Sequence, residues 1–567
     1  MPRLAMSVVL AFPKMDPISI GPSRRLQMQN LGVTAAIFAL LECWRPLYFL
    51  TDDNLDGTLP MLAGVGRRLM HGESPFVSDH LFGGHYDLLR DSSCSCWHPL
   101  YLVASILTGT PLRFCVIDAS ALCFLLLAAA GFVCLADFLR RENNLPLSDA
   151  RLTLCAQSFT YSMLVLCAGS SWIAILANNS ALPWLALGML QTQWRRGLTL
   201  TTLFSLHQIL GGHAGVTVSS SIFLTLFALG VACSRRSAAP LLLWFGGCAL
   251  AALLLSPLLI PMSQGFAASG RAVGLNAAFM DRYSFPLLLL PFSYFLGIFS
   301  WRLGIPYEFG FCPPWYAAAF ASCAAAWIIV PALASPTRRP ALELLSLGLV
   351  GFAVLLVIRP AWLGEILTHI PVLRSLRWPF REILQLQFFL HLFLILRSLG
   401  GPPPFQRVTI VLGMALFICP LFFLPAPSFH VMELDRHLLF SGASPRYWEK
   451  VKSLLKPGEV IVPVMNPDLG MMDRYDAPYS LIGAYNYPEL FEVTAATGYT
   501  LTVPRDKAYL KTESNLNNGI YAPSQEAEIL RERSNVRFIT LESVTPLRVT
   551  LSSPDGPIDL TPFLQGP

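Results

Sequence analysis

Three aspartates that follow the first long apolar run are the residues best suited to chemistry. They lie in the stretch Thr51-Asp52-Asp53-Asn54-Leu55-Asp56-Gly57. Carboxylates are costly where a membrane surface partly desolvates them, so a cluster at this place indicates a functional site. Helix capping before the apolar run 59–70 is the simpler alternative for any single aspartate. It accounts poorly for all three together.

The spacing of the aspartates also suggests a cation site. Asp52, Asn54, Asp56 and Gly57 match the first half of a calcium-binding EF-hand loop, but Ala63 stands where the bidentate glutamate is required. The sequence therefore does not predict an EF-hand. It keeps open a divalent cation held by oxygen ligands at the acidic cluster, and it predicts no other cofactor.

Arginines near the tenth apolar run form a second candidate site. Arg377 and Arg381 flank Trp378-Pro379-Phe380, where we expect a helix to begin. The positive end of a helix together with two guanidinium groups suits a phosphate or diphosphate. Anchoring at the membrane interface is the alternative.

Two further arginines and two histidines extend the predicted binding site. Arg271 and Arg282 lie in the polar loop 261–313, on the side of the membrane that we predict for the acidic cluster. His85 lies in a loop rich in aromatic, histidine and acidic residues, which suits either a sugar-binding surface or an ordinary solvated loop. His213 ends an apolar run after two glycines, where a polar group faces a cavity or packs against a partner helix.

The rest of the chain must position these residues within a membrane. Only 13% of the 567 residues are charged, against roughly 25% in soluble proteins, and the mean hydropathy is +0.53. The net charge of +5 is small for this length and gives no reason to expect a nucleic-acid partner. About twenty apolar residues span a bilayer. On that basis we predict about eleven transmembrane helices, at residues 31–50, 113–139, 150–168, 173–191, 197–212, 214–233, 240–260, 314–334, 341–358, 381–398 and 406–425.

The basic residues predict the orientation of these spans. Short cytoplasmic loops are enriched in Lys and Arg. With the N-terminus inside, every second loop carries basic residues: Arg24-Arg25, Arg140-Arg141, Arg195-Arg196, Arg235-Arg236, Arg338-Arg339, and Arg397 with Arg407. The N-terminus is therefore expected in the cytoplasm and the C-terminus outside it, with long extracytoplasmic loops at 51–112, 261–313 and 359–380.

Three parts follow from these patterns. Residues 1–30 are expected to form a cytoplasmic leader, and 31–425 the transmembrane domain, with apolar segment 98–108 re-entrant or interfacial. Residues 426–567 are expected to form a soluble extracytoplasmic domain, because the apolar runs stop and charges become mixed. In it, 460–464 and 536–540 read as strands and 525–532 as a helix. The predicted fold class is an all-α polytopic membrane protein with a small α/β C-terminal domain.

This order of features resembles the GT-C superfamily of lipid-dependent glycosyltransferases, and within it the YfhO-like bacterial membrane proteins. The similar stretches are Asp53 through Trp97-His98-Pro99-Leu100, Gly211-Gly212-His213, Arg377 through Arg381, and Leu530 to Ile539. The chain departs from the longer members of that family in its short outer domain and in the lack of a final span after it.

The resemblance implies an inverting transfer of a sugar from a polyprenyl-phosphate donor to a glycan, lipid or protein acceptor at the extracytoplasmic face of the bacterial inner membrane. Asp52 or Asp53 would be the general base. Arg377 and Arg381, with help from Arg271 or Arg282, would stabilise the leaving phosphate. Two alternatives are a transporter or flippase of lipid-linked sugars and a non-catalytic membrane assembly protein. Convergence of the aspartates and the arginines at one site favours the enzyme.

Overall fold

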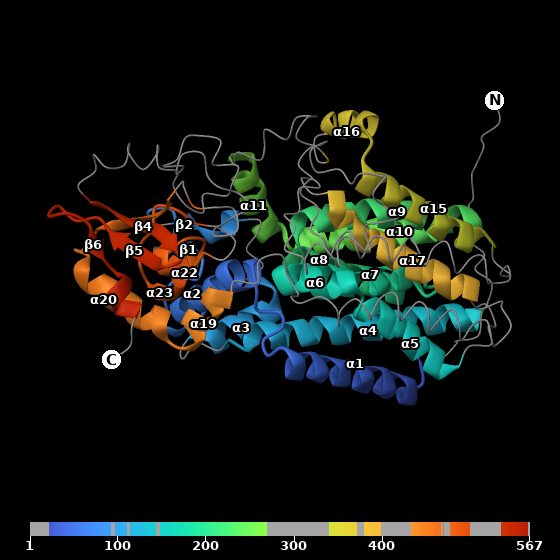
Figure 1. Ribbon diagram of the computed structural model, residues 1–567. Helices are drawn as coiled ribbons and strands as arrows, with labels where there is room; N and C mark the ends of the chain where they lie inside the picture. The colour runs from blue at the N-terminus through green and yellow to red at the C-terminus, as the bar shows by residue number, and fades with distance from the viewer. Residues whose placement is uncertain are drawn as a thin grey trace, which may run out of the picture.

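The chain folds into a helical bundle with a smaller α/β region at one end (Figure 1). The computed structural model describes residues 22–84, 86–91, 97–109, 114–142, 148–268, 340–370, 373, 379–398, 433–466, 469, 477–498 and 535–564. The bundle contains α1 (Arg24–Trp44), α4 (Val116–Glu142), α5 (Asp149–Thr160), α6 (Met163–Ser171), α7 (Ile173–Leu190), α8 (Trp194–Gly211), α9 (Ala214–Arg235), α10 (Ala239–Leu254), α11 (Ser256–Ala268), α15 (Pro340–Ile358), α16 (Ala361–Thr368), η7 (Pro379–Glu382) and α17 (Ile383–Ser398).

The apolar helices make this a multi-pass membrane protein. Within the described ranges, α4, α7, α9 and α15 are long and apolar enough to cross a membrane, and the bent pair α10 and α11 is a fifth candidate. The predicted number of eleven is not confirmed. Two of the eleven predicted spans, 314–334 and 406–425, lie outside the described residues.

Two predicted spans differ from the helices that form. The predicted span 150–168 is divided into α5 and α6, because the backbone leaves the helix at Tyr161 and Ser162 caps α6 through the Val165 amide. The predicted span 240–260 is α10 followed by α11, with a bend of 84° between them. The predicted re-entrant segment 98–108 forms helix α3 (Pro99–Gly109).

Close helix contacts hold the centre of the bundle together. A Cβ atom added at Gly131 of α4 would lie 2.5 Å from the Trp184 indole nitrogen of α7, so only glycine fits there. A Cβ at Gly188 of α7 would lie 2.8 Å from the Thr201 methyl group of α8. Small residues at helix crossings let backbones approach closely, which is how helices associate inside a membrane.

Arginines at the ends of α4 and α9 lie together at one end of this bundle. Arg235, in the last turn of α9, bonds the Glu142 carboxylate at the end of α4 (2.8 Å) and the Leu190 carbonyl at the end of α7 (2.9 Å). Arg140 bonds Asp149 at the start of α5 at 2.9 Å. The acidic cluster lies at the opposite end, because Asp118 at the start of α4 contacts the turn that leads into it.

The segment between α1 and α4 and the C-terminal part of the chain pack together at that opposite end (Figure 1). The first contains η1 (Asn54–Thr58), α2 (Leu59–Met70), β1 (Val77–Ser78), β2 (Tyr86–Asp87), η2 (Leu88–Arg90) and α3. The C-terminal region, as we call described residues 433–564, contains α19 (Glu433–Phe440), α20 (Ala443–Leu454), β3 (Val460–Met465), α22 (Tyr479–Ile482), α23 (Tyr487–Phe491), β4 (Val536–Val544), β5 (Leu547–Leu551), β6 (Ile558–Asp559) and η9 (Thr561–Leu564).

The sheet of the C-terminal region has the order β3-β4-β5-β6. The two strands expected from the sequence, near 460 and near 536, form and pair in parallel, with Val460 opposite Val536. Strands β4 and β5, and β5 and β6, pair antiparallel. The predicted helix 525–532 lies outside the described residues.

Buried polar contacts join this region to the α1–α4 segment. Arg68 of α2 pairs with the fully buried Glu489 of α23 at 2.9 Å, and Ser78 of β1 donates to the same carboxylate. The Gly83 amide donates to the Ala495 carbonyl at 2.7 Å, and the Ala495 amide donates to the His80 carbonyl at 2.8 Å. The two segments therefore form one body.

Candidate active site

The three aspartates lie in a strained connection between α1 and α2, residues 45–57, which we call the acidic turn. Leu47 and Asp52 both have positive φ angles, of 57° and 50°. Such a backbone costs about 1–3 kcal/mol at each residue and persists only where the surroundings hold it. The acidic turn ends in a turn of π-helix, η1, which begins at Asn54. Helical turns of this kind are rare and frequently mark functional sites.

Asn54 fixes the acidic turn against the break between α6 and α7. Its side-chain nitrogen donates to the carbonyls of Gly169 (2.8 Å) and Ser170 (2.9 Å), and its side-chain oxygen accepts from the Ile173 amide at 2.8 Å. Thr51 also donates to the Ser170 carbonyl at 2.9 Å. These bonds bring the aspartates beside Trp172, which lies between the two helices.

Trp172 connects the acidic turn to the predicted phosphate site. Its indole nitrogen donates to the Asp53 carboxylate. The guanidinium of Arg381 lies over its ring, 5.0 Å from the ring centroid, a cation–π contact. The aspartate and the arginine singled out from the sequence therefore meet on one side chain.

His213 extends the site beyond Arg381. Its Nδ1 accepts from the Gly215 amide at 3.1 Å and so caps α9, while its Nε2 lies 2.9 Å from Nη1 of Arg381. The two side chains thus lie within hydrogen-bond distance of each other, and His213 helps to position the guanidinium beside Trp172.

The helix start predicted at Pro379 is confirmed as η7, which leads into α17. Glu382, fully buried there, accepts a hydrogen bond from Ser219. Glu382 directly follows Arg381 in the chain, so a buried acid stands beside the arginine of this site.

Asp52 and Asp56 are buried, whereas Asp53 is partly exposed. Burial is the largest effect on the Asp52 carboxyl and raises its pKa to about 7. Burial also raises the pKa of Asp56 well above its usual range, and the charges of Asp53, Asp52 and Asp435 add to this effect. Asp53 is the aspartate that a substrate can reach.

Helix capping does not explain the cluster. Asp53 precedes η1, but its side chain makes no capping bond to that helix. Both carboxylate oxygens of Asp56 are buried, and they have no hydrogen-bond partner among the described residues. The described ranges also hold no group of three or more His, Cys, Asp or Glu side chains with the geometry of a metal site. The described residues thus give no support to the divalent cation that the sequence keeps open.

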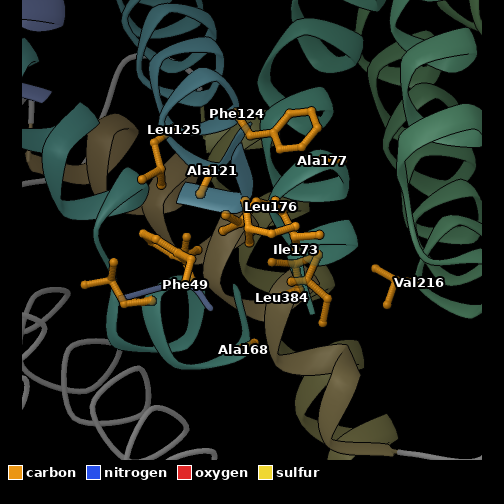
Figure 2. Close-up of a cluster of buried hydrophobic side chains, with 14 of the residues drawn as sticks. Phe49, Ala121, Phe124, Leu125, Ala168, Ile173, Leu176, Ala177, Val216 and Leu384 are labelled. Carbon is orange, nitrogen blue, oxygen red and sulfur yellow. The ribbon is translucent and has the colours of Figure 1, made fainter. Parts of the chain in front are cut away.

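A cluster of buried hydrophobic side chains joins the elements that carry the site (Figure 2). It combines Phe49 of the acidic turn with side chains of the helices that carry the site: Ala121, Phe124 and Leu125 of α4, Ala168 of α6, Ile173, Leu176 and Ala177 of α7, Val216 of α9 and Leu384 of α17. Because Ile173 and Leu384 are next to Trp172 and near Arg381 in the chain, packing of this cluster fixes the helix ends that present those two residues.

The structure brings together Asp52, Asp53, Asp56, Arg381 and His213. The other predicted site residues, Arg377, Arg271, Arg282 and His85, lie outside the described residues.

Sequence reasoning missed Trp172 and Asn54. Asn54 stands inside the aspartate motif, and Trp172 stands in a loop without basic residues between two apolar runs. A polar or aromatic residue at such a break, on the predicted side of the acidic cluster, is the signal that would have found both.

Comparisons with known proteins give distant structural likenesses. No protein-family model matches the sequence, and no curated protein sequence matches it. The chain is similar to the arabinofuranosyltransferase AftD from Mycobacteria, with 14% identity, a TM-score of 0.48, and coverage of 92% of this chain and 35% of that chain. It is also similar to ArnT from Cupriavidus metallidurans, solved bound to undecaprenyl phosphate, with 11% identity, a TM-score of 0.35, and coverage of 95% of this chain and 99% of that chain. This chain thus spans about a third of the length of AftD, and at TM-scores below 0.5 neither likeness decides its function.

Proposed function

We propose that this chain is a membrane glycosyltransferase of the GT-C type. It transfers a sugar from a polyprenyl-phosphate donor to an acceptor at the extracytoplasmic face. The observation that carries the proposal is the meeting of Asp53 and Arg381 on Trp172. A carboxylate and a guanidinium at one site are what the attacking and leaving groups of such a transfer require.

Asp53 is the general base in this mechanism. It takes the proton of an acceptor hydroxyl while that oxygen attacks the anomeric carbon of the donor sugar. The bond between the anomeric carbon and the phosphate oxygen breaks, its electron pair stays on the phosphate, and the stereocentre inverts. Asp53 is preferred over Asp52 because Asp52 is only 7% exposed, whereas Asp53 is partly exposed.

Arg381 and His213 receive the leaving phosphate. The guanidinium of Arg381, which His213 contacts at 2.9 Å, suits a phosphate oxygen that accepts from it. Charge grows on that oxygen in the transition state, so donors already aimed at it lower the barrier. Because phosphate leaves without being protonated, one carboxylate is enough, whereas inverting glycosidases need a second, protonated acid. Arg377, Arg271 and Arg282 remain predicted phosphate ligands, and His85 a predicted substrate-binding residue.

Sugar transfer in membranes tests the proposal. Wild type, Asp53→Asn and Asp52→Asn are expressed at matched levels and incubated with a panel of polyprenyl-phosphate sugars. Transfer by wild type that disappears in Asp53→Asn, with Asp52→Asn retaining part of it, supports an enzyme with Asp53 as base. Equal transfer by wild type and Asp53→Asn refutes the assignment. Binding of lipid-linked sugar by wild type without turnover of any donor favours the transporter.

A further inference from the structure

The backbone of the acidic turn is held from the C-terminal region by one arginine. Arg436 of α19 donates from Nη2 to the Pro46 carbonyl at 2.9 Å. From Nη1 it donates to the carbonyls of Leu47 (3.3 Å) and Leu50 (3.1 Å). Arg436 is only 7% exposed, so its charge is compensated inside the protein and not by water.

The amide groups of the same turn are bonded by carboxylates of α1 and α4. The Leu47 and Tyr48 amides donate to Glu42 at 2.8 and 3.3 Å, and the Phe49 amide donates to Asp118 at 2.8 Å. This stretch belongs to no regular element, and its buried backbone groups need such partners. Arg436 is the part of this arrangement that comes from the C-terminal region.

Asn486 holds the far end of the acidic turn. Its backbone amide donates to the Asp56 carbonyl at 3.1 Å, and its side-chain nitrogen donates to the Gly57 carbonyl at 3.2 Å. It is 3% exposed. Arg436 therefore bonds the acidic turn before Asp52 and Asp53 in the sequence, and Asn486 bonds it after them.

The strained residues lie within the stretch that Arg436 and Asn486 bond. Leu47, whose φ is 57°, is bonded directly by Arg436, and Asp52, whose φ is 50°, lies between the two contact points. A strained conformation needs surroundings that over-determine it. Without the hydrogen bonds from Arg436 and Asn486, the turn would relax toward ordinary φ values. The Asp53 carboxylate would then move away from Trp172.

We propose that Arg436 and Asn486 are positioning residues, through which the C-terminal region holds Asp53 in its place beside Trp172. The expected effect on kcat rests on the proposed glycosyltransferase function. The stabilisation of the acidic turn by these hydrogen bonds does not depend on it. The C-terminal region is then part of the active site's support and not only a surface for the acceptor.

The test compares full-length variants in lipid nanodiscs. Arg436→Met removes three hydrogen bonds to the turn, Arg436→Lys keeps the charge without the planar fork, and Asn486→Ala removes one bond. Arg537→Met is the matched control, because Arg537 lies in the same region and pairs with Glu459 at 2.6 Å in the sheet. The readouts are kcat, KM for the donor, and amide hydrogen exchange of peptides covering residues 45–57 and the strands β3 and β4.

We expect Arg436→Met to lower kcat by about 10²-fold, because a displacement of about 1 Å at a reacting group has this effect. Donor KM should stay within about twofold, since Arg381 and His213 still bind phosphate. Exchange should accelerate in 45–57 and not in β3 and β4. Asn486→Ala should show the same pattern more weakly, Arg436→Lys should recover part of the kcat, and Arg537→Met should behave as wild type.

Three results would overturn the proposal. The first is unchanged kcat with unchanged exchange in Arg436→Met. The second is faster exchange in 45–57 with unchanged kcat. The third is acceleration throughout the C-terminal region, which identifies a general structural role. If wild type turns over no donor, the glycosyltransferase proposal fails, and exchange alone decides: acceleration confined to 45–57 supports the hold on the turn, and unchanged exchange refutes it.

Discussion

Two clusters of buried polar side chains lie close to each other in this bundle and differ in how their hydrogen bonds are matched. The first joins His98, His207 and Ser180. Donors and acceptors alternate along it: the Leu100 amide to His98 (3.2 Å), His98 to His207 (2.9 Å), His207 to Ser180 (2.8 Å), and Ser180 to the Ala177 carbonyl (2.8 Å).

The second cluster is the site around Trp172, and its hydrogen bonds are not all matched. Both buried carboxylate oxygens of Asp56 have no hydrogen-bond partner among the described residues. Buried polar groups are normally satisfied, so a mismatch requires an explanation. A matched cluster ties helices α3, α7 and α8 together, whereas a mismatched one is completed by a ligand. Both clusters contain histidine, so the presence of this residue type does not distinguish them. The matching of hydrogen bonds distinguishes a structural cluster from a functional one.

The largest effect that separates the two clusters is expected from Arg381→Ala. Loss of a donor aimed at developing charge lowers turnover by about 10²–10³-fold. Arg381→Lys should recover only part of this, because lysine lacks the planar fork and stacks less well on Trp172. Transfer rates at saturating donor check both, and wild-type rates in Arg381→Ala would contradict the role of this cluster.

A smaller effect is expected from Trp172→Phe. Phenylalanine keeps an aromatic ring beneath Arg381 and removes only the N–H that donates to Asp53. A hydrogen bond to a charged group is worth about 1.5–3 kcal/mol, so kcat should fall by about 10- to 150-fold. Donor KM should change little. A large rise in KM with constant kcat would assign Trp172 to donor binding instead.

A substitution in the matched cluster of His98, His207 and Ser180 should lower the folding free energy and leave the transfer rate unchanged. Ser180→Ala leaves the ring N–H of His207 without its acceptor, which costs about 1–3 kcal/mol of folding free energy. Thermal unfolding in detergent measures this loss. Transfer per folded molecule should equal that of wild type, and a loss of transfer beyond the loss of folded protein would make this cluster part of the site.

The smallest effect is expected in the pH dependence of stability. Burial raises the pKa of Asp435 from its ordinary 3.8 to about 7, against hydrogen bonds from Ser480 and Tyr487. Between these values the unfolded chain has released this proton and the folded chain still holds it, so stability is lost as the pH rises from about 4 to about 7. Asp435→Asn cannot ionise and keeps the acceptor oxygen for Ser480. Its melting temperature should therefore fall less than that of wild type between pH 5 and pH 8, and an equal fall would show that Asp435 does not titrate there.

The sequence predicted which residue types meet in this site but not how they are joined. Asp53 and Arg381 each stood out because charge is costly at the ends of apolar runs. Their link, Trp172, did not stand out, since tryptophan beside a membrane span is ordinarily an interface anchor. Arg436 and Asn486 lie more than 370 residues further along the chain than the turn that they hold. No local pattern reports a contact over that separation.

Helix positions were predictable where periodicity and length agreed. The spans at 173–191, 214–233 and 341–358 correspond to α7, α9 and α15 within a few residues. The divided and bent spans were not predictable from hydropathy, because apolar content does not report a backbone turn. At 161–162 the break follows from capping by Ser162, a signal of one residue inside an apolar run.

The most direct measurement of the central claim separates donor binding from transfer at the Trp172 site. Purified wild type, Asp53→Asn and Arg381→Ala are compared for affinity toward a polyprenyl-phosphate sugar and for the rate of sugar transfer. The account predicts that Asp53→Asn binds donor as wild type does and transfers about 10²–10⁴ times more slowly, while Arg381→Ala loses both binding and transfer. Transfer at the wild-type rate by Asp53→Asn, or donor binding unaffected in Arg381→Ala, would contradict it.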